Sequence, residues 1–404
     1  MRIIVQKYGG TSVADADRLR HVAQRVIRTQ DAGFAPVVVV SAQGDTTDIL
    51  LQKAYEISAR PSARELDMLL STGEQISIAL LAIAIQVHGR AVISLTGGQV
   101  GIRTDHAHTK AKIIDIDNRR ILEELGKGKI VIVAGFQGVN EEEDITTLGR
   151  GGSDTTAVAL AAALEAEVCE IYTDVDGVYS ADPRTIPGAR KLREISYDEM
   201  LELASLGARV LHLRSVEIAK KYGVPLHVRS SFNDNPGTMV VEEVANLENA
   251  RLVTGIAHTM DVAKITLMGV PDQPGVAARL FSALAERAVN VDMIIQSGSR
   301  AGINDISFTV GKEDLRAAVD AANQLCQELN AENVVAENGV GKVSIVGAGM
   351  VSHPGVAARM FRTIAGEGVN IQMISTSDIS ISCIIDAGAV DRVVRALHKV
   401  FIET

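Results

Sequence analysis

Residues 2–12 read Arg-Ile-Ile-Val-Gln-Lys-Tyr-Gly-Gly-Thr-Ser, a β-type run with a lysine and two glycines at its carboxyl end. Glycines let the backbone approach an anion and direct N–H groups at it, and a helix expected from residue 15 adds partial positive charge. Lys7, Gly9 and Gly10 therefore indicate a phosphate-binding corner. An ordinary strand–turn–helix corner with a surface lysine explains the segment equally well, so the rest of the chain must decide.

The composition is that of a globular protein with more than one domain. The 404 residues are 47% hydrophobic and 22% charged, so two or three domains are expected. A net charge of -10 disfavours nucleic acid as a partner. Three scattered cysteines without a CxxC pair are typical of a reducing, cytoplasmic setting, and we expect no signal peptide. The most apolar stretch, 78–85, is too short to span a bilayer, so no membrane partner is expected.

Up to residue 245, short β-branched runs alternate with helical patterns. Continuous apolar runs indicate strands buried on both faces, as in a parallel sheet between helix layers. Ligands in such sheets bind at the carboxyl ends of strands, where Lys7 and Ser41 fall. We therefore predict an α/β catalytic domain over 1–245. Its strands are expected at 37–40, 91–95, 130–133, 168–172 and 226–228, and its helices at 15–30, 46–59, 63–88, 118–125, 154–165, 197–205 and 215–222.

The C-terminal part contains an internal repeat. Residues 274–281, Pro-Gly-Val-Ala-Ala-Arg-Leu-Phe, recur as Pro-Gly-Val-Ala-Ala-Arg-Met-Phe at 354–361. Each copy reads as a strand, a Pro-Gly turn, a helix, two strands and a second helix. This pattern predicts two small βαββαβ units over 262–335 and 342–404, joined to the first domain by a linker near 244–251.

The sequence argues against three other kinds of site: a dinucleotide site, a P-loop and a histidine metal site. Gly347-Ala348-Gly349 follows a strand like a dinucleotide fingerprint, but Ser352 replaces the third glycine and Pro354 follows, which argues against a Rossmann site. The sequence contains no GxxxxGK[ST] motif, so the chain is not a P-loop enzyme. His106-Ala107-His108 lacks cysteine or carboxylate partners in register, so we interpret it as a solvated loop rather than a metal site.

Two further loops carry charged residues suited to substrates. The first contains Gly-Arg-Gly-Gly-Ser-Asp at 149–154 and leads into an Ala-rich helix that Ser153 is expected to cap. Arg150 suits a carboxylate because its guanidinium binds bidentately. The second loop, 172–184, has aspartates, tyrosines and an arginine that could grip a nucleotide. Both loops also have an ordinary interpretation, as a capped helix start and a turn-rich connection.

The segments 7–12, 149–154 and 173–184 resemble the signatures of aspartate kinase, a member of the amino-acid kinase fold family. They occur in the same order, and the resemblance covers essentially the whole chain. The C-terminal units resemble its tandem ACT regulatory domains, and the length resembles that of the monofunctional form, so we expect no fused homoserine dehydrogenase. The resemblance implies transfer of the ATP γ-phosphoryl group to the β-carboxylate of L-aspartate, the first step of lysine, threonine and methionine biosynthesis. A carboxylate is already ionised at neutral pH, so no general base is required.

The resemblance also implies roles for individual residues. As the catalytic residues, Lys7 would stabilise the transferring group and Asp154 would orient the Lys7 side chain. ATP, carrying Mg²⁺, is expected at Lys7, Tyr8, Gly9, Gly10, Ser41, Thr173, Asp174, Tyr179, Ser180, Ala181, Asp182, Pro183, Arg184 and Arg209. Aspartate is expected at Thr47, Glu74, Arg150, Gly151, Gly152 and Ser153. Arg209 departs from the lysine that members commonly carry, and it keeps the positive charge but not the compact ammonium group.

Regulation by threonine, lysine or both is the further implication, because ACT units pair side by side and bind amino acids at their interface. The same residues could instead belong to a dimerisation module. We expect a homo-oligomer through these units, and an internal start at Met239 or Met260 could yield a shorter regulatory subunit. The expected effector residues are Asp272, Gly275, Ala277, Asn290, Asp292 and Gln296 in the first unit, and Asn370, Ile371 and Ser377 in the second.

Two other functions stay open from the residues alone. The tandem ACT units and the sequence Tyr-Gly-Gly-Thr-Ser at residues 8–12 argue against a kinase of glutamate or acetylglutamate. A catalytically inactive amino-acid sensor is disfavoured by intact Lys7, Arg150 and Asp154, although Arg209 keeps it open.

Overall fold

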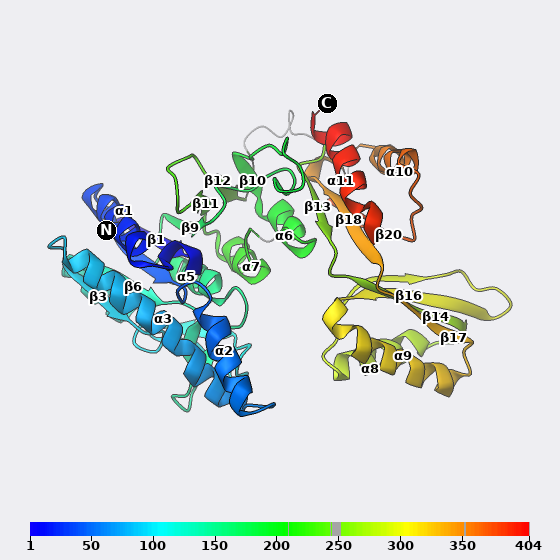
Figure 1. Cartoon of the computed structure of the whole chain (residues 1–404), viewed down its shortest axis with the longest axis horizontal. Helices are drawn as coiled ribbons and strands as arrows, with labels where there is room; N and C mark the ends of the chain where they lie inside the picture. The colour runs from blue at the N-terminus through cyan, green and yellow to red at the C-terminus, as the bar shows by residue number, and fades with distance from the viewer. Residues whose placement is uncertain (209, 243, 245–251, 351–352, 404) are drawn as a thin grey trace. The chain divides into compact units, whose positions relative to one another are not determined.

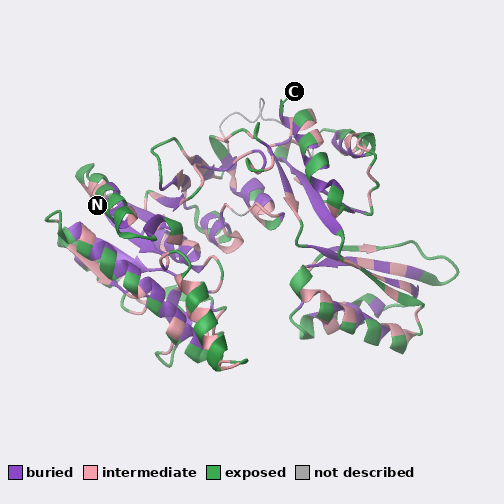
Figure 2. Cartoon of the chain, in the orientation of Figure 1, coloured by how far each residue is buried: buried purple, intermediate pink, exposed green. Residues whose placement is uncertain are grey.

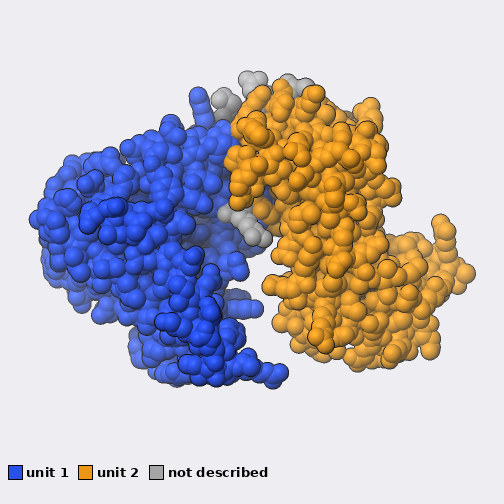
Figure 3. All heavy atoms as spheres, viewed as in Figure 1, with its two compact units in different colours: residues 1–179, 191–204, 209–247 blue, residues 180–190, 205–208, 248–404 orange. Residues whose placement is uncertain are grey.

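The computed structural model describes residues 1–208, 210–242, 244, 252–350 and 353–403. Its backbone divides into two compact units (Figure 3). Unit 1 comprises residues 1–179, 191–204 and 209–247, and unit 2 comprises residues 180–190, 205–208 and 248–404. The predicted linker near 244–251 lies almost wholly outside the described residues.

Unit 1 is built on an eight-stranded sheet with the order β10-β12-β11-β9-β1-β2-β6-β3. β12 runs antiparallel to β11, and the other neighbouring pairs are parallel. Val37 to Val40 are fully buried, as expected of a strand covered on both faces. The strands are β1 (Ile3–Tyr8), β2 (Ala35–Val40), β3 (Val92–Leu95), β6 (Ile130–Ala134), β9 (Val168–Thr173), β10 (Glu194–Ser196), β11 (Leu226–Ser230) and β12 (Thr238–Val241).

Helices cover this sheet, and the predicted α/β class is confirmed (Figure 1). A second, small sheet with the order β5-β4-β7-β8 was not predicted. The helices are α1 (Ala16–Asp31), α2 (Thr46–Ile57), α3 (Ala63–Gln86), α4 (Arg119–Gly126), α5 (Gly152–Ala163), α6 (Tyr197–Ser205) and α7 (Leu213–Tyr222), and the small strands are β4 (Ile102–Thr104), β5 (Ile113–Ile116), β7 (Gln137–Val139) and β8 (Ile145–Thr147).

Helix α3 is a core helix of unit 1. By length and composition it is apolar enough to cross a membrane, but half of its most apolar window is buried inside the fold. Figure 2 shows buried and exposed residues alternating along it. Asp67 and Glu74 are among its buried residues, and both belong to the site described below.

Unit 2 contains two four-stranded antiparallel sheets, each accompanied by two helices. Gly275 and Gly355 precede α8 and α10 with φ values of +94° and +100°, so the sequence repeat is also a repeat of backbone conformation. The first sheet contains β14 (Ala263–Pro271), β15 (Val291–Gln296), β16 (Ile303–Val310) and β17 (Asn333–Glu337), with α8 (Val276–Glu286) and α9 (Leu315–Leu329). The second contains β13 (Gly255–Thr259), β18 (Val340–Val346), β19 (Met373–Thr376) and β20 (Ser380–Asp386), with α10 (Val356–Gly366) and α11 (Val390–His398).

The second sheet takes its fourth strand from an unexpected part of the chain. β13, which precedes the first repeat, pairs with β18, and Ile256 lies opposite Ile345. The segment 342–404 ends in α11 and a π-helical turn, Lys399–Glu403, and so leaves one edge of β18 to be paired by another segment. A purely local reading of the repeat, βαββαβ within 342–404, therefore differs from the structure.

Candidate functional site

The carboxyl end of β1 and the start of α5 hold the first part of the site. Lys7 Nζ lies 2.7 Å from Asp154 Oδ1, and both side chains are largely shielded from solvent. A Cβ at Gly9 would lie 3.4 Å from Lys7 Nζ, and one at Gly10 would lie 2.6 Å from the carbonyl oxygen of Ala42. The two glycines therefore let β1 pack closely against the ammonium group and against the loop that follows β2.

A cavity of about 310 Å³ opens beside this ion pair. It brings together Lys7 of β1, Gly10 just after β1, Ser41 just after β2 and Asp154 in the first turn of α5. The remaining lining residues include every residue predicted to bind aspartate, namely Thr47, Glu74, Arg150, Gly151, Gly152 and Ser153.

Glu74 projects from α3 into the cavity wall and is only 3% exposed. Its Oε1 accepts the backbone N–H of Ala42 at 3.0 Å, whereas Oε2 has no partner among the described residues. Burial raises the pKa of this carboxyl from 4.5 to about 7. A cationic ligand group at Oε2 would therefore stabilise the ionised form.

Arg150 lies at the opposite wall, in a loop that two left-handed glycines shape. Gly149 and Gly151 have φ values of +75° and +70°, and Gly151 is the N-cap of α5. The prediction that Ser153 caps the helix is wrong, because this turn starts α5 at Gly152 and places Ser153 in its first turn. Arg150 is exposed and has no acidic partner within the part of the chain that the structure describes.

A buried carboxylate beneath this loop was missed by the sequence interpretation. Asp67, fully buried on α3, accepts the hydroxyl of Thr147 at 2.5 Å and the backbone N–H of Thr109 at 3.0–3.1 Å. His108 Nδ1 lies 2.7 Å from the same carboxylate. The only available signal was an aspartate two turns before Glu74 on an apolar helix.

This network corrects the interpretation of His106-Ala107-His108 as a solvated loop. His106 is exposed and pairs with Glu142, but His108 is mostly buried against Asp67. Among the described residues, no group of three His, Cys, Asp or Glu side chains could hold a metal ion. Arg214 of α7 supports the loop that carries Arg150 by donating to the carbonyl of Leu148 at 2.6 Å.

Several polar side chains of the acidic loop after β9 pair with one another or with Lys191. Asp176 accepts the phenol of Tyr179 at 2.6 Å and Lys191 Nζ at 3.1 Å, and the Tyr179 bond is the main cause of a lowered Asp176 pKa. Arg184 pairs with Asp182 and lowers the pKa of that carboxyl. Thr173 donates its hydroxyl to Asp174 at 3.1 Å, and Pro183 is exposed.

Three residues predicted to bind the nucleotide have buried side chains. The ring of Tyr8 stacks on Tyr172 with centroids 4.7 Å apart and lies in the core of unit 1. The side chains of Ser180 and Ala181 are buried in unit 2. Arg209 lies outside the described residues.

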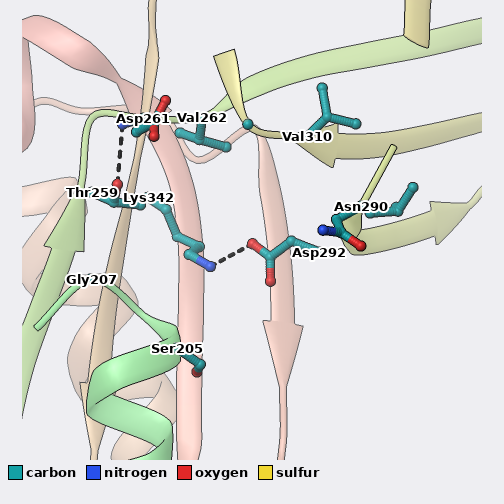
Figure 4. Close-up of a pocket in the computed structure, with 11 residues that line it drawn as sticks. Ser205, Gly207, Thr259, Asp261, Val262, Asn290, Asp292, Val310 and Lys342 are labelled. Carbon is teal, nitrogen blue, oxygen red and sulfur yellow. Dashed lines mark hydrogen bonds and ion pairs between the residues drawn. The ribbon is translucent and has the colours of Figure 1, made fainter. Parts of the chain in front are cut away.

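Unit 2 has a cavity of its own, of about 330 Å³, where the Lys342 ammonium pairs with the Asp292 carboxylate (Figure 4). Asn290 and Asp292 of the predicted effector set line it. Lys342 is 3% exposed, so it is a buried cation whose partner side chain is half exposed.

The other predicted effector residues lie elsewhere in unit 2. Asp272 follows the end of β14 that pairs with Ile303, whereas Val291 pairs with Val310 at the other end of the sheet. Within a single chain, Asp272 and Asn290 therefore lie at opposite ends of this sheet. Gly275 and Ala277 stand at the start of α8, Gln296 ends β15, Asn370 and Ile371 precede β19, and Ser377 follows it with its hydroxyl 2.9 Å from that of Ser380.

Comparison with known proteins agrees with this architecture. Residues 2–230 match the amino acid kinase family, and residues 264–327 and 343–401 each match an ACT domain. The fold and the site thus define an amino acid kinase that carries two regulatory ACT domains.

The aspartokinase of Geobacillus stearothermophilus is 54% identical over 401 residues, which cover 99% of this chain and 97% of that protein. The crystal structure of E. coli aspartokinase III in complex with aspartate and ADP (R-state) matches with a TM-score of 0.83 and 27% identity, over 98% of this chain and 99% of that chain. The same enzyme in complex with lysine and aspartate (T-state) matches with a TM-score of 0.75 and 27% identity, over 99% of each chain. The chain belongs to the aspartokinase family, whose activity is the phosphorylation of aspartate under allosteric control by amino acids. The predicted family, fold class and enzyme class are confirmed.

Proposed function

We propose that the cavity beside Lys7 and Asp154 is where the ATP γ-phosphoryl group passes to the β-carboxylate of L-aspartate. The Lys7 ammonium stabilises the charge that spreads over the transferring oxygens, and Asp154 holds the ammonium in place through its 2.7 Å ion pair. No side chain has to remove a proton, because the attacking carboxylate is ionised at neutral pH. The product is the acyl phosphate 4-phospho-L-aspartate.

Aspartate is positioned by charges on opposite walls of the cavity. Arg150 binds one carboxylate in a bidentate manner, and Glu74 Oε2, which lacks a partner among the described residues, accepts the α-ammonium group. Thr47, Ser153 and the amides of Gly151 and Gly152 complete the contacts. Fixing both ends of the substrate leaves its β-carboxylate facing Lys7.

ATP enters as its Mg²⁺ complex, with the metal held mainly by phosphate oxygens and water. Gly9, Gly10 and Ser41 face the phosphates, and the loop of Thr173, Asp174, Tyr179, Asp182, Pro183 and Arg184 holds the nucleoside. The buried side chains of Tyr8, Ser180 and Ala181 leave only their backbone for this role.

The ACT units bind amino-acid effectors, threonine or lysine, and link copies of this chain into an oligomer. Support comes from the acidic and amide side chains of Asn290 and Asp292 at the unit 2 cavity and from the lysine complex of a related aspartokinase. Because the predicted effector residues lie at both ends of the first ACT sheet, a second copy of the chain has to complete the effector site. A cytoplasmic location and a shorter subunit starting at Met239 or Met260 remain proposals.

The single observation that carries the proposed function is the convergence of Lys7, Asp154, Glu74 and Arg150 on one cavity. The test supplies ATP, Mg²⁺ and aspartate, glutamate or acetylglutamate in turn, with hydroxylamine to trap an acyl phosphate as a hydroxamate. We expect hydroxamate with aspartate. Hydroxamate only with glutamate or acetylglutamate supports the other amino-acid kinases, and none with any substrate supports an inactive sensor.

A further inference from the structure

A series of two hydrogen bonds between three side chains joins the acidic loop to the C-terminal helix of the second ACT unit. Ser180 Oγ lies 3.0 Å from His398 Nε2, and His398 Nδ1 lies 2.9 Å from Glu403 Oε1. Ser180 and His398 are 218 positions apart in the sequence, and their side chains are 1% and 0% exposed. All three residues belong to unit 2.

The hydrogen bonds in this series have one consistent direction. The Glu403 carboxylate can only accept, so His398 donates from Nδ1 and presents the lone pair of Nε2. Ser180 therefore donates its hydroxyl proton to Nε2, while its oxygen accepts the backbone N–H of Arg190 at 2.9 Å. Both ring nitrogens of His398 therefore have partners, which holds the buried ring in a single orientation.

The backbone and the apolar residues of the loop are anchored in the same place. The carbonyl of Ser180 accepts the N–H of Ile256 in β13 at 2.7 Å, and the N–H of Ser180 bonds to the carbonyl of Arg190. Ala181 and Ile186 are part of the core of the second ACT unit, together with Leu397. Thus residues 180–190 fold as part of the regulatory unit, although the sequence places them inside the catalytic domain.

The exposed side of the loop carries its charges. The Arg184 side chain is 88% exposed and that of Asp182 is 28% exposed, and the two are paired. Tyr179 and Lys191, at either end of the segment, form an isolated antiparallel bridge in unit 1. Residues 180–190 are therefore covalently continuous with Tyr179 at one end and with Lys191 at the other.

The same three residues resemble the Ser–His–acid arrangement of hydrolases, but that role does not fit. A nucleophilic serine must reach a substrate, and Ser180 is buried with its oxygen already accepting an N–H. The series is suited to holding a loop.

We propose that His398 is a positioning residue for the nucleotide: it fixes Ser180, and through it the Asp182–Arg184 face, so that ATP affinity depends on the state of the second ACT unit. This inference rests on the proposed role of loop 173–184 in nucleotide binding. An effector that shifts α11 would weaken ATP binding without a direct contact to the nucleotide.

The test compares Ser180→Ala and His398→Phe with Ser344→Ala in the full-length protein. Ser344 bonds to Ser382 at 2.7 Å inside the second ACT sheet, so Ser344→Ala removes a buried hydroxyl bond of the same unit in which neither Ser180 nor His398 takes part. Equilibrium binding of ATP, the KM values for ATP and for aspartate, and thermal unfolding are measured for each variant.

We expect Ser180→Ala and His398→Phe to weaken ATP binding by about 2- to 10-fold, the range for loss of one buried hydrogen bond, with the aspartate KM unchanged. The double variant should lose less than the product of the single effects. If His398→Phe fails to fold, Ser180→Ala, which removes a single oxygen atom, still decides.

Three outcomes would overturn the proposal: wild-type ATP affinity in Ser180→Ala, an equal shift in Ser344→Ala, or a rise in the aspartate KM of the same size as that for ATP. Wild-type protein that forms hydroxamate with aspartate while the variants bind ATP normally rejects the inference alone. Wild-type protein that neither binds ATP nor forms hydroxamate rejects the proposed function, and the inference with it.

Discussion

Lys7 and Asp154, 147 positions apart in the sequence, form an ion pair of 2.7 Å at the edge of the parallel sheet. Lys7 is the penultimate residue of β1, and Asp154 lies in the first turn of α5. Their largely shielded pair places a cation at one side of a polar cavity, where low solvent exposure strengthens its field.

Replacing the cation should separate binding from turnover. We expect Lys7→Ala to lower kcat by at least about 10²-fold, because the charge that stabilises the transferring group is lost, while aspartate binding persists. Hydroxamate formation gives kcat, and isothermal titration calorimetry gives aspartate affinity. Lys220→Ala removes an exposed lysine paired with Asp198 and serves as the matched control. Near-normal kcat in Lys7→Ala would remove Lys7 from the mechanism.

Glu74 should make aspartate binding depend on pH. Because burial raises the Glu74 pKa to about 7, the free enzyme holds a partly protonated carboxyl at neutral pH. The α-ammonium group requires the ionised form, so kcat/KM for aspartate should rise with pH and level off above about 7. Glu74→Gln should lose this inflection and raise the aspartate KM. An unchanged inflection in that variant would assign it to another group.

The same substitution should stabilise the fold at high pH. The folded state binds the Glu74 proton more tightly than the unfolded state, so the free energy of unfolding falls as pH rises from 4.5 to about 7. The loss is up to about 3 kcal/mol, at ~1.4 kcal/mol per pKa unit. Glu74→Gln should therefore be more stable than wild type at pH 8 and similar to it at pH 4. Urea unfolding at both pH values measures this, and parallel pH profiles would contradict it.

The Asp67 network should act on aspartate rather than on ATP. Thr147→Val removes the hydroxyl that ties the end of β8 to α3, so the Arg150 loop and Glu74 lose their fixed spacing. We expect the aspartate KM to rise by about 10-fold, since bonds to a buried carboxylate contribute ~1.5–3 kcal/mol, with the ATP KM unchanged. Thr146→Val, at the next position, removes a buried bond of 2.6 Å to Thr104 and should lower stability only. Equal changes in the aspartate KM of both variants would argue against a positioning role.

Gly10 should tolerate no side chain. A Cβ there would lie 2.6 Å from the carbonyl oxygen of Ala42, so Gly10→Ala must displace the loop that lines the cavity. We expect reduced kcat/KM and lower stability, measured by steady-state kinetics and thermal unfolding. Gly126→Ala, at the end of α4 with no atom within 4 Å of the added Cβ, should instead be neutral or stabilising by up to ~1 kcal/mol. A fully active Gly10→Ala enzyme would show that the loop adapts.

Local sequence signals located most of the secondary structure. The predicted helix at 46–59 is observed over Thr46–Ile57, and the apolar run at 130–133 is observed as Ile130–Ala134. These elements are decided by short-range periodicity and by turn residues, which sequence displays directly. The predicted cap at Ser153 failed because the left-handed conformation of Gly151 started the helix earlier.

The motifs named residues that line one cavity, but the network that supports them was not predicted. Lys7, Glu74 and Arg150 converge as expected, yet nothing local marks Asp67 as the carboxylate beneath the substrate loop. Its partners His108, Thr109 and Thr147 lie 41, 42 and 80 positions away in the sequence. Such pairings form only when α3 packs beside β8.

The sequence alone determined the class of this protein: its three glycine-bearing motifs, the repeat of Pro-Gly turns and the family they identify are properties of nearby residues. Tertiary structure decided where segments belong. β13 completes a sheet whose other strands lie beyond the first ACT unit, and Ser180 joins the core that contains His398. Buried backbone groups and side chains must find partners in space, and those partners need not be neighbours in the chain.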